Sequence, residues 1–150
     1  MKRLLIALLA LLAAWPAAAP ATAPGDRYAE GQVWEYKTRP QDAGSLLRIQ
    51  RIEDGGKLGT IYHINLIGIV LGNKGPTVIQ HLPVSKATLD ASVIRLSDAK
   101  RDWPDATAGI AQWRAAQGGV FDIPISEIVA TVEKAVSGNN APDPTANDAT

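Results

Sequence analysis

The longest stretch of closely spaced apolar residues, 59–82, organises the predicted fold. Between residues 59 and 71 the apolar side chains occupy both sets of alternating positions, with Tyr62, Ile64 and Leu66 in one set and Ile61 and Ile67 in the other. Since side chains alternate between the two faces of a strand, this pattern predicts a strand that is apolar on both faces. Residues 72–76 then interrupt the stretch with turn-forming glycine, asparagine and proline, and residues 77–82 resume it. We therefore predict a central β-hairpin, with Leu66 in the core.

Two further strands are predicted before this hairpin. Residues 32–39 alternate, with Trp34, Tyr36 and Thr38 on one face, and residues 40–44 form a turn. Residues 45–52 form the second strand, where the alternation slips between Ile49 and Ile52, so that a bulge near Gln50 is expected. Residues 54–56 (DGG) are a strong hairpin signal. Together these elements predict a four-stranded antiparallel meander.

After Pro83 the apolar spacing becomes helical. Ser85 is a candidate N-cap, and Leu89, Val93 and Leu96 follow at i, i+4 and i+7 on one helical face. A second helix is predicted over residues 105–117, a short fifth strand over 120–123, and a third helix from Ser126. Strands followed by helices predict an α+β fold, in which two or three helices cover one face of a four- to five-stranded antiparallel meander.

The two ends of the chain differ from this domain. Lys2 and Arg3 precede an apolar run over residues 4–15, which is shorter than the roughly 20 residues of a membrane span. Residues 1–21 are therefore predicted to be a signal peptide, with an uncleaved anchor as the alternative. Small-x-small cleavage sites lie at 17–19, 19–21 and 21–23, and the middle one is favoured because the others leave a proline after the cut. The prediction continues with a loose lead-in over 22–30, a single domain over 31–136 and a disordered tail over 137–150.

Composition narrows the functional classes. The absence of cysteine excludes disulfides, thiol catalysis and attachment of lipid to a cysteine. The chain has 15 basic and 15 acidic side chains, and loss of Lys2 and Arg3 with the signal peptide leaves 13 against 15, a net charge of −2. With no run of basic residues, no nucleic-acid partner is expected. We expect a periplasmic or secreted protein that makes no membrane contact after signal cleavage.

Residues of catalytic type are present without a catalytic pattern. His63 and His81 are too few for a metal site and lack a ligand spacing, so they are predicted to be half-exposed strand residues. Ser85 and Ser126 lie where helices should begin, and a nucleophile elbow is missing from the sequence. The carboxylate pair Asp102 and Asp105 lies in a solvated link. We predict no catalytic, metal-binding or cofactor-binding residue, and no cofactor.

Four cations on the first two predicted strands are candidates for binding a partner. Lys37, Arg39, Arg48 and Arg51 would line the open face of the sheet if the helices cover the face of Trp34 and Tyr36. Such a face suits an acidic partner, and ordinary solvated strand charge is the alternative. Trp103 and Trp113 are candidate aromatic anchors, although the helical spacing of Trp113 from Ile110 favours the core.

Four short segments of the sequence together resemble a known group of proteins. Residues 31–39 (GQVWEYKTR), 81–83 (HLP), 112–114 (QWR) and 119–121 (GVF) resemble a group of small exported bacterial proteins of unassigned function. The resemblance covers most of residues 31–136 and implies an exported single domain without catalytic residues to transfer.

The predicted function is an exported, non-catalytic protein-binding domain, such as an inhibitor or immunity-type factor in the cell envelope. The alternative is a carrier of a small ligand, with a pocket between sheet and helices lined by Tyr36, Tyr62 and Trp113. An enzyme that uses His81 or a carboxylate is the third hypothesis.

Overall fold

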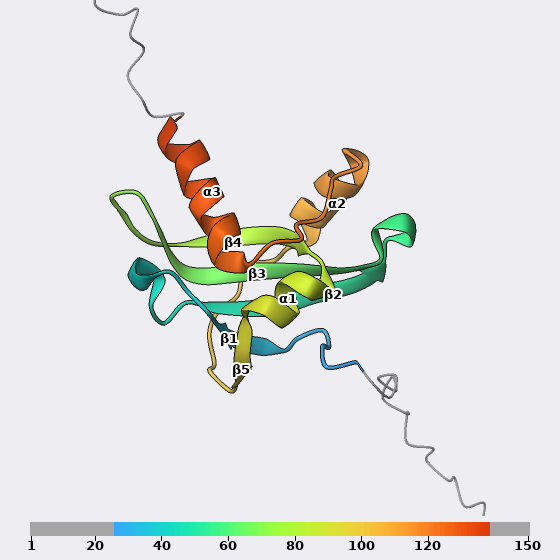
Figure 1. The fold of residues 1–150 in the computed structure, drawn as a ribbon, viewed down its shortest axis with the longest axis horizontal. Helices are drawn as coiled ribbons and strands as arrows, with labels where there is room; N and C mark the ends of the chain where they lie inside the picture. Colours follow the sequence, from blue (N-terminus) through green and yellow to red (C-terminus); the bar gives the residue numbers. More distant parts are fainter. Residues whose placement is uncertain (1–25, 139–150) are drawn as a thin grey trace, which may run out of the picture.

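The computed structural model describes residues 26–138, which form an α+β domain around a five-stranded antiparallel sheet. The strands are β1 (Val33–Tyr36), β2 (Leu46–Asp54), β3 (Thr60–Leu71), β4 (Lys74–Val84) and β5 (Val93–Ser97). Their order across the sheet is β4-β3-β2-β1-β5, as Figure 1 shows. The first four strands are neighbours in chain order, which confirms the predicted meander and its central β3–β4 hairpin.

Three helices lie against this sheet: α1 (Lys86–Ser92), α2 (Thr107–Ala115) and α3 (Ile125–Gly138). Helices α1 and α3 cover the face that carries Tyr62, Ile64 and Leu66, so the prediction of helices on one face is confirmed for these two. Helix α2 packs on the opposite face, where Trp113 contacts His63. Because β3 is covered on both sides, its residues 61–66 are all buried.

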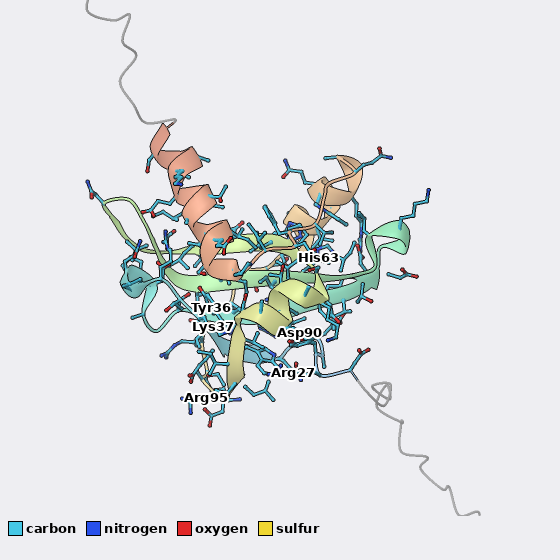
Figure 2. All side chains as sticks on the ribbon, in the orientation of Figure 1. Arg27, Tyr36, Lys37, His63, Asp90 and Arg95 are labelled. Carbon is cyan, nitrogen blue, oxygen red and sulfur yellow. The ribbon has the colours of Figure 1, made fainter. Side chains whose placement is uncertain are left out.

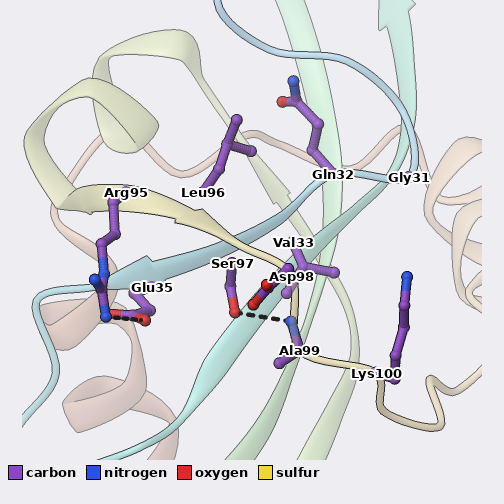
Figure 3. Close-up of a pocket in the computed structure, with 10 residues that line it drawn as sticks. All are labelled: Gly31, Gln32, Val33, Glu35, Arg95, Leu96, Ser97, Asp98, Ala99 and Lys100. Carbon is purple, nitrogen blue, oxygen red and sulfur yellow. Dashed lines mark hydrogen bonds and ion pairs between the residues drawn. The ribbon is translucent and has the colours of Figure 1, made fainter.

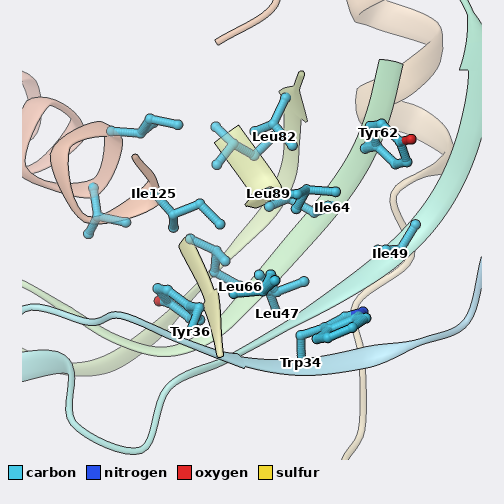
Figure 4. Close-up of a cluster of buried hydrophobic side chains, with 14 of the residues drawn as sticks. Trp34, Tyr36, Leu47, Ile49, Tyr62, Ile64, Leu66, Leu82, Leu89 and Ile125 are labelled. Atoms are coloured by element: carbon cyan, nitrogen blue, oxygen red, sulfur yellow. The ribbon is translucent and has the colours of Figure 1, made fainter. Parts of the chain in front are cut away.

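The main core lies between the sheet and helices α1 and α3. Figure 4 shows strand residues such as Trp34, Leu47 and Ile64 converging with Leu89 from α1 and Ile125 from α3. Leu66 is 0% exposed at the centre of β3, so its predicted core position is confirmed.

The predicted bulge in the second strand is confirmed. The pairing of β2 with β3 shifts register between Ile49 and Arg51. Because the extra residue restores the alternation, Ile49 and Ile52 both pack with the main core despite being three positions apart.

The prediction of a helix through Leu96 is wrong, and the fifth strand lies elsewhere than expected. Ser85 does cap α1, since its Oγ accepts a hydrogen bond from the Thr88 backbone N–H at 3.1 Å. The helix nevertheless ends at Ser92, and β5 follows at once and pairs with the free edge of β1. The β-branched pair Val93 and Ile94 suits a strand better than a helix, and the backbone groups of β1 gain partners.

The segment predicted as the fifth strand, 120–123, makes only an isolated parallel bridge within the described residues, between Phe121 and Val84. The second helix is shorter than its predicted range 105–117. Asp105 accepts a hydrogen bond from the Thr107 backbone N–H at 2.9 Å just before that helix begins. Ser126 lies inside the first turn of α3 rather than before it.

The two ends of the described chain can be compared with the predicted domain limits. Helix α3 extends to Gly138, two residues into the range predicted as a tail. The predicted signal peptide and residues 139–150 lie outside the described residues. Within 26–138, none of the helices has both the length and the apolar character needed to cross a membrane.

Candidate functional site

The segment that joins β5 to α2 shapes the surface of the sheet on the α2 face. This crossing segment (residues 98–104) starts at the β5 edge and passes β1 and β2. It reaches β3, where the Asn65 Nδ2 donates a hydrogen bond to the Pro104 carbonyl at 3.0 Å. Gaps remain on both sides of the segment because it crosses the strands without pairing with them.

An open groove of about 660 Å³ lies along β1 and β5, beside the start of the crossing segment. Figure 3 shows Arg95 and Glu35 side by side at one end and Lys100 beyond Ala99 at the other. The guanidinium of Arg95 donates to both carboxylate oxygens of Glu35, at 2.8 and 2.9 Å. This bidentate contact lowers the pKa of the Glu35 carboxyl.

Strand β5 lines this groove through Arg95, Leu96 and Ser97. Among the described residues β5 pairs only with β1, so the backbone groups on its other side face outward. Ile94 and Leu96 are both 55% exposed, more than any other large apolar side chain of residues 26–138. An unpaired strand edge beside exposed apolar side chains is a template for an added strand.

Two of the predicted partner-binding cations have intramolecular partners. Lys37, labelled in Figure 2, donates from its Nζ to the Ala91 carbonyl at 3.0 Å. Arg39 is largely buried and bonds to Asp42, to Glu133 of α3 and to the Val70 carbonyl. The guanidinium of Arg39 therefore joins the β1–β2 connection to β3 and α3, and the prediction that it lies on an open face is wrong.

The other two cations lie on β2, on the face that α2 and the crossing segment partly cover. Arg51 is exposed and lies 3.9 Å from Glu53. Arg48 is half-buried, between Val33 of β1 and Asn65 of β3 in the strand register. The four predicted cations thus do not form one cluster, and a role for Lys37, Arg48 and Arg51 in binding remains a prediction.

A polar chain that the sequence does not predict lies under α2, and the prediction that His63 is half-exposed is wrong. His63 is 0% exposed, and its Nδ1 lies 2.8 Å from the His81 Nε2, so the two rings share a hydrogen bond. On the other side, the His63 Nε2 lies 3.1 Å from a carboxylate oxygen of Glu53, which also forms an ion pair with Arg114 of α2. Trp113 packs edge-on against His63, with ring centroids 5.0 Å apart.

Burial favours the neutral form of both histidines. It lowers the pKa of His63, against the raising effect of Glu53, and it lowers the pKa of His81 to about 4, helped by the nearby His63. The ion pair with Arg114 lowers the pKa of Glu53, so this carboxylate stays charged. Among the described residues no group of three or more histidine, aspartate or glutamate side chains could hold a metal. This chain of polar side chains therefore holds α2 to the sheet.

A second polar cluster joins the start of the domain to α1. The Tyr28 hydroxyl donates to Asp90 at 2.7 Å, and Lys86 forms an ion pair with the same carboxylate at 2.7 Å. The pKa of Asp90 is lowered, chiefly by Lys86, and burial raises the pKa of Tyr28. Arg27 lies over the Trp34 ring, 5.1 Å from its centroid. Figure 2 shows Asp90 on α1 and Arg27 close to it. These contacts hold the start of the described chain against α1 and β1.

The three residues expected to line a carrier pocket do not meet. Tyr36 and Tyr62 belong to the main core under α1 and α3. Trp113 lies on the opposite face of the sheet, against His63 and His81. A single pocket lined by all three is therefore impossible in this fold.

Comparison with known proteins adds no family to these observations. A scan against protein-family models and searches of curated proteins and of solved structures found no match to the chain. The resemblance to small exported bacterial proteins stays a prediction.

Proposed function

We propose that this protein is an exported, non-catalytic protein-binding domain that recruits its partner through the outer edge of β5. The observation that carries the proposal is the unpaired edge of β5 beside two exposed side chains, Ile94 and Leu96. An extended peptide that adds a strand there gains main-chain hydrogen bonds, and its alternate side chains enter the neighbouring groove. An inhibitor or immunity-type factor of the cell envelope is the role that this mode of binding suits.

The chemistry around the edge defines the partner segment. Glu35 holds Arg95 in an ion pair and Asp98 also lines the groove, which leaves Lys100 and, at the β1 end, Lys37 as the nearby cations without an ion pair within residues 26–138. The partner should therefore be an extended segment with apolar residues at alternate positions and acidic residues between them. The apolar residues would cover Ile94 and Leu96, and the acidic ones would face the cations.

A peptide library displayed on phage and selected against the mature protein tests this function. Selected peptides should be extended and acidic-apolar. In NMR titrations they should shift the backbone amides of β5, and their affinity should fall at least tenfold in Ile94→Lys and in Leu96→Lys. A fall of that size is expected because a lysine at the edge interrupts strand addition.

Val78→Lys is the matched control, because Val78 is 43% exposed on β4, the opposite edge strand of the same sheet. The affinity of the Val78→Lys protein for the selected peptides should equal that of the unmodified protein. Peptides that keep their affinity in both β5 variants, or a library that yields no binder, would contradict the proposal.

A further inference from the structure

A second, smaller cleft lies beside the crossing segment, between that segment and strands β1 and β2. Its volume is about 230 Å³. Three cationic side chains line it, and no acidic one does. The lining includes Arg48 of β2, Val33 of β1, and Lys100, Arg101 and Trp103 of the crossing segment. The cleft therefore combines positive charge with an apolar and aromatic wall.

Arg48 enters this cleft with an unsatisfied donor. Its Nε is buried and has no hydrogen-bond partner. Val33, its neighbour on β1, offers no side-chain acceptor. Asn65, its neighbour on β3, uses its amide oxygen to accept a hydrogen bond from Gln50, and its Nδ2 donates to the Gln80 and Pro104 carbonyls. A buried donor without an acceptor is destabilising. An acceptor that enters the cleft would therefore gain a hydrogen bond from the Arg48 guanidinium.

The other charges nearby leave the cleft positive. No ion pair of Lys100 or Arg101 is found within residues 26–138. The carboxylate of Glu35, on β1, is held by Arg95 at the β5 side. Asp98 lines the larger groove rather than this cleft. A bound anion would therefore meet three cations without a competing carboxylate in the wall.

We propose that this cleft binds a small organic anion that carries a carboxylate or phosphate group on a planar apolar body. The guanidinium of Arg48 would hold two oxygens of the anion, because its donors match the geometry of these groups. Lys100 and Arg101 would add charge at the mouth, and the planar body would pack against Trp103 and Val33. A cleft below the roughly 300–1,000 Å³ of pockets for drug-sized ligands fits an anion of this size. The site does not depend on strand addition at β5.

Titration calorimetry of the mature protein with phenyl phosphate, benzoate and inorganic phosphate tests this site. We expect saturable binding of phenyl phosphate or benzoate, weaker binding of inorganic phosphate, and affinity that falls as salt is added. Arg48→Gln should weaken binding at least about tenfold, because a charge-assisted hydrogen bond is worth more than one factor of ten. Arg101→Gln should weaken it by a smaller but measurable factor, because Arg101 adds charge at the exposed mouth. Trp103→Leu should weaken phenyl phosphate more than inorganic phosphate.

Arg51→Gln is the matched control, since Arg51 lies on the same strand but does not line the cleft. It should leave every affinity unchanged. Arg101 is exposed, so Arg101→Gln keeps the test decisive even if Arg48→Gln unfolds the domain.

Three results would overturn the proposal. One is no saturable binding of either aromatic anion at millimolar concentration. Another is equal losses in Arg101→Gln and Arg51→Gln. The third is loss of affinity for the peptides selected on β5 in Arg48→Gln with the affinities for the small anions unchanged, which would assign Arg48 to the partner surface instead.

Discussion

Two leucines of the same sheet, Leu66 and Leu96, show how position alone decides the energetic weight of a residue. Leu66 is 0% exposed in β3, whereas Leu96 is 55% exposed in β5. Leu66→Ala should lower the free energy of unfolding by about 2–5 kcal/mol, through lost transfer energy and the cavity left behind. Leu96→Ala should lower it by less than about 1 kcal/mol. Urea unfolding of both variants gives these values, and similar losses for the two would place Leu66 outside the core.

The histidine pair should make stability depend on pH above the range of the carboxylates. The pKa of His81 is about 4 in the folded protein, and that of His63 is also lowered, both mainly by burial. In the unfolded chain both should titrate near 6.5. As the pH falls from about 6.5 towards 4, the unfolded state takes up protons that the folded state does not. The free energy of unfolding should therefore decrease as the pH falls through this window. The contribution of the two neutral histidines to that free energy should be complete above about pH 6.5.

His81→Gln isolates the contribution of one ring. Glutamine keeps a polar group beside His63 but does not titrate, so the loss of stability between pH 7 and pH 5 should be smaller than in the unmodified protein. Urea unfolding at about pH 7, 6 and 5 measures both slopes. At these pH values Glu53 stays ionised, because its ion pair with Arg114 lowers the pKa of this carboxyl. Equal slopes would show that His81 does not titrate differently on folding.

The sequence shows that both histidines lie on strands but not that they meet. Their contact depends on the register of β3 against β4, which shifts between Ile64 and Leu66. A shift of one residue would turn His81 to the other face. The side-chain pattern does not specify this irregularity, so the polar chain with Glu53 was not predicted.

At the scale of elements, helix α2 depends on a close approach to β4. A Cβ built on Gly109 would lie 2.6 Å from the His81 Cβ and 3.0 Å from its Cγ. Alanine normally favours a helix over glycine by about 1 kcal/mol. Here the clash with a strand residue should outweigh that gain, so Gly109→Ala should lower the melting temperature.

Gly138→Ala is the control for this prediction. Gly138 ends α3, and a Cβ there would meet nothing within 4 Å. The melting temperature of the Gly138→Ala protein should stay within about 4 °C of that of the unmodified protein, which corresponds to roughly 1 kcal/mol for a domain of this size. Thermal unfolding followed by circular dichroism compares the two, and a stabilised Gly109→Ala protein would mean that α2 can move off the sheet without cost.

The strands were easier to predict than the helices for a physical reason. Strands β1 to β4 are joined by short turns, so the local alternation and turn residues define them. Strand β5 is different, because Val93 and Leu96 also fit a helical spacing. Only the distant edge of β1, reached through pairs such as Trp34 with Leu96, makes the strand the better choice. The apolar character of both faces of β3 was the available signal that a helix covers each side.

At the scale of the whole molecule, the predicted cleavage sites all precede the first buried residue of the described part of the chain. Tyr28 is 2% exposed, and its ring packs edge-on against Trp34 and Tyr62, each at 5.6 Å between centroids. All three candidate cleavage sites lie before this residue, at 17–19, 19–21 and 21–23. Any of them would leave the Tyr28 contacts intact, so cleavage and folding do not conflict.

We expect the exported protein to begin near Thr22, because cleavage after Ala21 avoids a proline immediately after the cut. Intact-mass measurement of the protein recovered from the envelope or medium checks this start. Replacing Ala19 and Ala21 by lysine should block the favoured site and cause the precursor to accumulate, since signal cleavage requires small residues there. The same replacements should leave the melting temperature of the folded domain unchanged, because both positions precede Tyr28, the first buried side chain among residues 26–138. An exported protein that keeps Met1 would contradict the prediction and favour the uncleaved anchor.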